Sequence, residues 1–225
     1  MFAQDMLFRI PALLIAITIH EFAHGKAADI MGDPTAKRAG RLTLNPVAHL
    51  DPIGLIMLWL FKFGWAKPVP INPFNFNNRR RGLILVSGAG PAANILTAFI
   101  VLLLYRFWSI GGLLAGAQSF SSAGYTAFSS IQYVLQLTFI YNLYLAVFNL
   151  IPVPPLDGSK ILMGFLPQKQ ALSYSMIESY GPIILVALLY LGIITQIILP
   201  LVGAIEWLLN NVSNFIVFGL LSPFL

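Results

Sequence analysis

The chain has 225 residues, of which 58% are hydrophobic and only 9% are charged, so it is too apolar and too poor in charge for an ordinary soluble domain. Its mean hydropathy of +0.81 indicates an integral membrane protein and excludes a nucleic-acid-binding module, despite the formal net charge of +5. Because the sequence contains no cysteine, it has no disulfide and no thiolate metal site, and any metal must be bound through nitrogen and oxygen atoms.

Long segments without charge predict the membrane-spanning helices. The first apolar run, at 10–20, is not followed by a small-residue cleavage site, so we interpret it as a retained helix and not as a signal peptide. Serines and glycines make the later stretch at 116–130 polar and turn-like, which predicts a loop there. The crossings expected after the first are at 82–105, at about 131–151 and at 179–205, with a sixth helix in the apolar tail at 207–225.

Two segments fit no simple crossing. The apolar stretch at 52–61 has ten residues, which suits a re-entrant or interfacial helix better than a full span. The segment at 65–73 carries closely spaced prolines, which exclude a helix and favour extended backbone. We therefore expect an all-α polytopic membrane protein of about five or six transmembrane helices with one short extended hairpin. It forms a single domain over 1–225, and its C-terminal helices cover about 179–225.

The distribution of positive charge predicts the orientation in the cell membrane. Nine of the 13 lysines and arginines lie between the first apolar run and the second, so this segment should be cytoplasmic. The next two crossings then return Asp157 to the same side as His20 and His24. The nine residues are Lys26, Lys37, Arg38, Arg41, Lys62, Lys67, Arg79, Arg80 and Arg81.

The clearest chemical pattern is His20-Glu-Phe-Ala-His24. Two histidines at i and i+4 of a helix lie on one face, where both can bind one zinc ion. Glu21 lies next to that face and can take a proton from a water molecule, as the glutamate of such motifs does in metalloproteases. The pattern follows the apolar run at 10–19, and ionisable side chains inside a membrane helix are costly, which favours this interpretation over a surface helix with two incidental histidines.

Zinc in a catalytic site needs a third protein ligand, and Asp157 is the first candidate. It lies in the proline-rich segment 149–158, where the prolines end a helix and Gly158 permits a tight turn beside the carboxylate. An aspartate at this place can also be the N-cap of a helix that starts at Ser159, which is the structural alternative.

A second pair of donors competes for the third ligand position. His49 and Asp51 lie close together in the segment 44–52, just before Pro52. A short helical turn ahead of this proline also explains the segment. His49 is the remaining histidine of the sequence after His20 and His24, so the residues alone leave both assignments open.

These patterns resemble the site-2 protease family of intramembrane zinc metalloproteases, in its compact prokaryotic branch without a PDZ or CBS domain. The resemblance covers roughly residues 7–165. It rests on the blocks His20-Glu-Phe-Ala-His24, Gly32-Asp-Pro-Thr-Ala-Lys37, Gly40-Arg-Leu-Thr-Leu-Asn-Pro46, Phe63-Gly-Trp-Ala-Lys-Pro-Val-Pro70, Gly90-Pro-Ala-Ala-Asn94 and Asn149 with Leu156-Asp157-Gly158.

The resemblance implies a three-helix catalytic core at about 7–165 that cleaves a transmembrane protein substrate within the lipid bilayer. It implies one zinc ion held by His20, His24 and Asp157, with Glu21 as the catalytic base. It also suggests that the extended segment lies near the substrate path.

Asn94 and Asn149 are further candidates, as side-chain amides that position the substrate or the oxyanion. For Asn94 the structural alternative is a hydrogen bond between packed helices beside small residues. The run Arg79–Arg81 is interpreted as a cytoplasmic anchor at the membrane interface, with contact to anionic lipids as the alternative.

Three other functional classes are less compatible with the sequence. A metal or solute transporter needs polar groups along several spans, whereas the ionisable residues here gather at one face. A catalytically silent membrane-protein binder would most simply show a broken ligand set, and here the proposed set is complete. A serine intramembrane protease is disfavoured because Ser87 has no histidine partner in a facing span.

Overall fold

A computed structural model of the chain describes residues 2–61, 66–116 and 120–221. Within these ranges the structure is helical apart from loops, turns and one isolated antiparallel bridge between Leu50 and Ala66. The prediction of an all-α polytopic membrane protein is therefore confirmed. Five helical segments are long and apolar enough to cross a membrane: Met6–Ile30, Arg79–Leu114, Ser122–Asn149, Gln168–Tyr190 and Ile193–Leu220.

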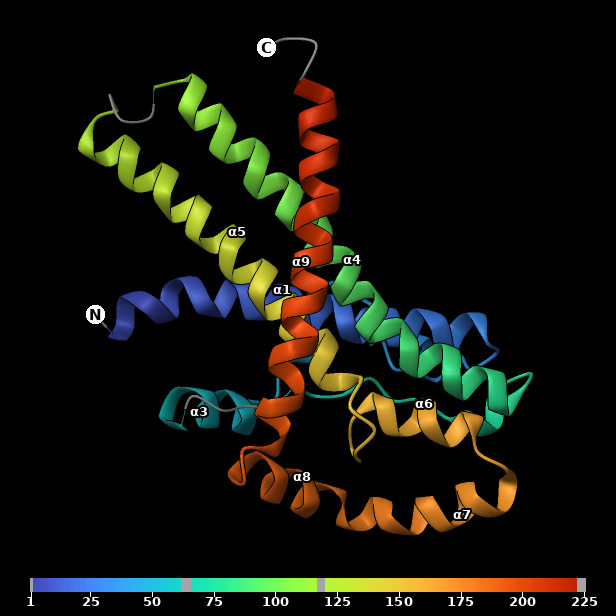
Figure 1. The fold of residues 1–225 in the computed structure, drawn as a ribbon. Helices are drawn as coiled ribbons and strands as arrows, with labels where there is room; N and C mark the ends of the chain where they lie inside the picture. Colours follow the sequence, from blue (N-terminus) through green and yellow to red (C-terminus); the bar gives the residue numbers. More distant parts are fainter. Residues whose placement is uncertain (1, 62–65, 117–119, 222–225) are drawn as a thin grey trace.

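Three long helices form the centre of the molecule, as expected. These are α1 (Phe2–Ile30), α4 (Arg79–Leu114) and α5 (Ser122–Asn149), and each packs against the other two. Figure 1 shows α9 (Ile193–Leu221) lying across α4 and α5. Fully buried alanines line this packing, because a side chain of one methyl group lets helices approach closely. They are Ala12, Ala16, Ala98 and Ala146.

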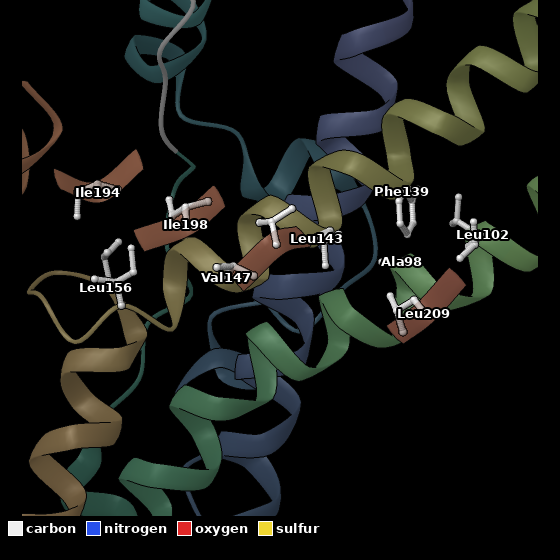
Figure 2. Close-up of a cluster of buried hydrophobic side chains, with 12 residues drawn as sticks. Ala98, Leu102, Phe139, Leu143, Val147, Leu156, Ile194, Ile198 and Leu209 are labelled. Atoms are coloured by element: carbon white, nitrogen blue, oxygen red, sulfur yellow. The ribbon is translucent and has the colours of Figure 1, made fainter. Parts of the chain in front are cut away.

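The main apolar cluster joins α4, α5 and α9, as Figure 2 shows. It includes Ala98 from α4, Leu143 and Val147 from α5, and Ile194 and Ile198 from α9. Because lipid is as apolar as these side chains, the cluster stabilises the helix arrangement mainly through close packing. It places the carboxyl-terminal end of α5 firmly against the rest of the core.

Both α4 and α5 are longer than predicted. The side chain of Asn78 accepts a hydrogen bond from the backbone N–H of Arg81, so α4 begins three residues before the predicted span. The loop predicted over 116–130 is wrong from Ser122 onward, because α5 begins there. Hydroxyl groups in its first turns donate to carbonyls of their own helix, which makes them compatible with helical backbone.

The C-terminal part divides differently from the prediction. A single crossing at 179–205 is wrong, because the chain turns at Gly192, where φ is +72°. This left-handed conformation is accessible to glycine and ends α8 (Gly181–Tyr190). The separate sixth helix at 207–225 is also wrong, since α9 runs without a break from Ile193 to Leu221.

The two irregular segments agree in part with the sequence analysis. α3 (Pro52–Phe61) has ten residues and lies where the short helix was predicted. Residues 66–72 contain no helix, as predicted, but a short 3-10 helix, η2 (Pro73–Asn75), begins at Pro73, because a proline is tolerated in the first turn of a helix. Residues 62–65 lie outside the described residues. Among the described residues the hairpin is reduced to the one bridge between Leu50 and Ala66, supported by the hydrogen bond from the Lys67 N–H to the His49 carbonyl at 3.0 Å.

A short helix, α6 (Asp157–Phe165), packs on the amino-terminal half of α4. The guanidinium of Arg80 donates to the carbonyls of Gly164 at 2.5 Å and Phe165 at 2.7 Å, at the carboxyl end of α6. Arg80 therefore satisfies free carbonyls of a helix end, a structural role beyond the anchor predicted for Arg79–Arg81. This contact helps to hold the helix that begins at Asp157.

Candidate metal centre

His20, His24 and Asp157 meet in the interior although they come from distant parts of the chain. The two Nε2 atoms of the histidines lie 3.0 Å apart. Oδ2 of Asp157 lies 3.1 Å from Nε2 of His20 and 3.0 Å from Nε2 of His24. Both histidines are 6% exposed. Three potential ligand atoms thus point at one small volume between α1 and the start of α6.

The hydrogen bond of His24 determines which ring nitrogen carries the proton. Its Nδ1 lies 2.7 Å from the carbonyl oxygen of Val86 in α4. A carbonyl can only accept, so Nδ1 must donate, and in the neutral ring Nε2 keeps its lone pair.

A relay of two asparagines determines the tautomer of His20 in the same way. The amide nitrogen of Asn142 donates to the Thr138 carbonyl at 2.8 Å, so its oxygen faces Asn94. Asn94 donates to that oxygen at 2.7 Å and to the Ala16 carbonyl at 2.9 Å. The oxygen of Asn94 then accepts from Nδ1 of His20 at 2.6 Å. Nε2 of His20 is left as an acceptor, directed at the other two ligand atoms.

Two glycines allow the helices to meet at this point. A Cβ atom on Gly90 of α4 would lie 2.4 Å from Nε2 of His24 and 2.6 Å from Cε1 of His20. A Cβ atom on Gly158 would lie 2.2 Å from the carbonyl oxygen of Leu150. Both distances are far below van der Waals contact, so only glycine permits α4 and the start of α6 to pack here.

The chemistry of the three donors fits a cation. Two ring nitrogens with lone pairs and one carboxylate oxygen repel one another at about 3 Å unless positive charge lies between them. In a tetrahedral zinc site with bonds of about 2.0–2.2 Å, the ligand atoms are separated by little more than 3 Å. His20, His24 and Asp157 could therefore hold one metal ion. Among the described residues this is the one group of three such side chains close enough to do so.

The N-cap alternative for Asp157 is wrong. Asp157 is the first residue of α6, Leu156 occupies the cap position, and no side chain caps this helix. The carboxylate instead contacts the two histidines.

The competing donors lie elsewhere. Nε2 of His49 donates to the Thr43 carbonyl at 2.8 Å, and the carboxylate of Asp51 accepts from the Gly54 N–H at 2.8 Å, at the start of α3. Neither residue belongs to the group of ligand atoms.

The remaining predicted site residues make different contacts. Glu21 is half-buried, and its Oε2 accepts a hydrogen bond from the Val69 N–H at 2.7 Å. Asn149 is also half-buried and donates to the Leu145 carbonyl of its own helix at 3.0 Å. It thus makes no hydrogen bond to the three clustered side chains.

The sequence analysis missed two groups that support the site. Asn142 lies in an apolar helix and is fully buried, and a polar residue inside a predicted span was a usable signal for it. The carbonyl of Val86 carries no signal in the sequence, because every residue has one.

Comparison with known proteins shows the family to which the chain belongs. The profile of peptidase family M50 matches residues 73–191, more than half of the chain, a range that contains Asp157 but not α1. A Bacillus subtilis (strain 168) protein named "Putative zinc metalloprotease YwhC" is 39% identical over 202 residues, which are 88% of this chain and 87% of that protein.

A second relative, "Putative zinc metalloprotease Rip2" of Mycolicibacterium smegmatis, is 32% identical over 183 residues, which are 78% of this chain and 64% of that protein. No solved structure matches the chain significantly. The family match over half of the chain and the relative that is similar over nearly its whole length agree with each other. The chain therefore belongs to peptidase family M50, the site-2 protease family.

Proposed function

We propose that this protein is an intramembrane zinc metalloprotease that hydrolyses peptide bonds within transmembrane segments of membrane proteins. The observation that carries the proposal is the convergence of Nε2 of His20, Nε2 of His24 and Oδ2 of Asp157 at 3.0–3.1 Å from one another. In this proposal the three side chains hold one zinc ion and leave a further coordination position open. When bound, zinc activates water and polarises the carbonyl of the scissile peptide.

Glu21 is proposed as the general base. It directly follows His20 and lies in the helical turn between the two histidines, so its side chain starts beside the candidate metal centre. One of its oxygens accepts the Val69 N–H, which leaves the other oxygen free to take a proton from the attacking water. The same carboxylic acid can then pass the proton to the leaving amine.

The two asparagines are assigned different parts. Asn94 is fully buried and uses both its oxygen and its nitrogen in hydrogen bonds to His20, Ala16 and Asn142. We propose that it orients His20 and does not contact the oxyanion. Asn149 is half-buried and uses its amide nitrogen in one bond, so a second N–H is available. It stays our candidate for positioning the substrate carbonyl.

The membrane orientation is proposed from charge. Nine of the 13 lysines and arginines lie at positions 26–81, which places the loops between α1 and α4 in the cytoplasm. His20, His24 and Asp157 are close to this end of the helices. The site would then lie within the cell membrane toward its cytoplasmic face, with a transmembrane protein as substrate and the lipid bilayer as surroundings.

The proposal is tested with the purified full-length protein and a panel of single-span membrane proteins. We expect His20→Ala, His24→Ala and Asp157→Ala each to lose bound zinc, measured by metal analysis, while His49→Ala keeps it. Glu21→Gln should keep zinc and abolish cleavage, because it removes the base and leaves the ligands. Zinc binding without any cleavage by the wild type would favour a catalytically silent binder, and zinc transport into vesicles would favour a transporter.

A further inference from the structure

Residues 66–72, here called the strap, run past Glu21 in extended form. We infer that the strap fixes the carboxylate of Glu21 through the backbone N–H of Val69, and that Asp33 is a positioning residue that anchors the strap. The inference rests on the proposed function, because it assigns a task within the same site.

The contact between the strap and Glu21 is made by one specific donor. The N–H of Val69 lies 2.7 Å from Oε2 of Glu21. Pro68 and Pro70 flank it and have no N–H, so Val69 supplies the only backbone donor of these three residues. The Val69 side chain is 6% exposed, and a Cβ atom on Gly25, one helical turn after Glu21, would lie 3.3 Å from it. The strap is thus packed closely against the helix that carries Glu21.

The first end of the strap is attached to the loop before α3. The N–H of Lys67 donates to the His49 carbonyl at 3.0 Å, and Leu50 and Ala66 form the isolated bridge. The guanidinium of Arg41 donates to the carbonyl of Lys67 at 2.8 Å. The N–H and the carbonyl of Lys67 are therefore both held, two residues before Val69.

The second end is attached to the turn that follows α1. Asp33 is completely buried, and its Oδ2 accepts the N–H of Asn72 at 2.7 Å. Its Oδ1 accepts the amide of Asn75 at 2.7 Å and the N–H of Thr35 at 3.1 Å. A carboxylate with several donors forms strong, directional bonds. Asp33 thus ties the end of the strap to the end of the helix that carries Glu21.

Hydrogen bonds on both sides of Val69 hold the strap, so the Val69 N–H can change its position and direction only slightly. A glutamate side chain has several rotamers, and a hydrogen bond from a fixed donor selects those in which the carboxylate meets it. Small displacements of a catalytic group reduce the rate strongly, so a base held in one place is an advantage. The prolines also prevent an incoming strand from forming a continuous ladder with residues 68–70, which argues for positioning and against strand pairing.

The kinetic test compares Val69→Pro, which removes the N–H and keeps extended backbone, with Val69→Ala, which keeps the N–H. We expect Val69→Pro to lower kcat at least tenfold below Val69→Ala, with unchanged zinc content and with KM within about twofold. Equal kcat values in the two variants would overturn the inference. A loss confined to KM would also overturn it, because it would assign the strap to substrate binding.

A second test is independent of activity. The chain has no cysteine, so the single thiol of Val69→Cys reports whether the strap stays packed. In detergent-solubilised protein we expect its reaction with N-ethylmaleimide to be slow and to accelerate at least tenfold when Asp33→Ala is added. Phe74→Ala is the matched control, because this side chain is 78% exposed and makes none of the hydrogen bonds to Asp33. An unchanged rate with Asp33→Ala would remove Asp33 from the anchor.

Different experimental outcomes contradict the proposed function and the role of the strap. If the wild type cleaves no substrate, or if Glu21→Gln cleaves as the wild type does, the proposed function fails, and the inference fails with it. If the wild type cleaves and Val69→Pro matches Val69→Ala, the inference alone fails. If Val69→Pro loses its zinc, the kinetic comparison is made with Asp33→Ala instead. We then expect Asp33→Ala to lower kcat and also to accelerate labelling of the thiol in Val69→Cys.

Discussion

The amide oxygen of Asn94 lies 2.6 Å from Nδ1 of His20, and this contact links the metal centre to the packing of three helices. Asn94 belongs to α4 and His20 to α1, and Asn142 of α5 supports Asn94 from the other side. The direction of every hydrogen bond in this relay is defined, because the relay ends at backbone carbonyls, which can only accept. The tautomer of one histidine is thus determined by residues that contribute no ligand atom to the candidate metal centre.

Loss of the Asn94 side chain should weaken zinc binding without removing a ligand. We expect Asn94→Ala to reduce zinc affinity about 10- to 100-fold, since the ring of His20 loses its orientation and its preferred tautomer. Competition with a chelator of known affinity measures the change. Asn149→Ala is the control, because this amide bonds only to its own helix among the described residues, and its zinc affinity should stay at the wild-type value. Equal affinities in both variants would contradict the relay.

A methyl group on Gly90 should disrupt the metal centre. Its Cβ would lie 2.4 Å from Nε2 of His24, so the helices must separate or the histidine must turn away. We expect Gly90→Ala to lower zinc affinity at least tenfold and to lower the midpoint of thermal unfolding. Gly88→Ala adds the same methyl group to the same helix, where nothing lies within 4 Å, and should change neither quantity. A similar effect of both substitutions would indicate a general effect on α4.

Asp33 should make the stability of the fold depend on pH. Burial alone would raise the pKa of its carboxyl group, but hydrogen bonds from Thr35, Asn75 and Asn72 outweigh burial and hold the pKa below its usual value. A lowered pKa in the folded state contributes stability that is complete above the unfolded value of about 4 and is lost as the pH falls through the folded value.

The difference in unfolding temperature between wild type and Asp33→Asn should accordingly be largest above about pH 5 and shrink as the pH falls below about 4. The measurement is made on metal-free protein in detergent, so that loss of zinc at low pH does not contribute. A difference that stays constant or grows on acidification would contradict the assignment.

The orientation can be measured with single cysteines in a chain that has none. We expect cysteines at the exposed positions Ala39 and Gln168 to react with an impermeant maleimide only after the membrane is opened. A cysteine at Ala123, near the start of α5, should react in intact cells. Reaction of the first two from outside would invert the proposed topology. Reaction from opposite sides would contradict the return of the chain to one face before Asp157.

Much of the candidate metal centre could be predicted from the sequence, because short-range geometry determines the placement of its side chains. The spacing of His20 and His24 places both on one helix face, and the prolines before Asp157 end a helix and bring an acid to its boundary. Helix boundaries were less accessible. Counting charges predicted one crossing from 179 to 205, whereas the backbone turns at Gly192. A glycine within an apolar run does not by itself indicate whether a helix continues.

Only the tertiary structure shows which donor lies beside the two histidines and which groups support the three side chains. From the sequence, His49 and Asp157 were both possible partners for His20 and His24. The fold places Asp157, and not His49, beside these two histidines. Helix packing brings the Val86 carbonyl and the Asn142 amide to the site. The strap, which is held at both ends, brings the Val69 N–H to Glu21. The physical reason is that periodicity acts over a few residues, whereas contacts across 48 to 133 residues depend on how closely small residues such as Gly90 let the helices approach.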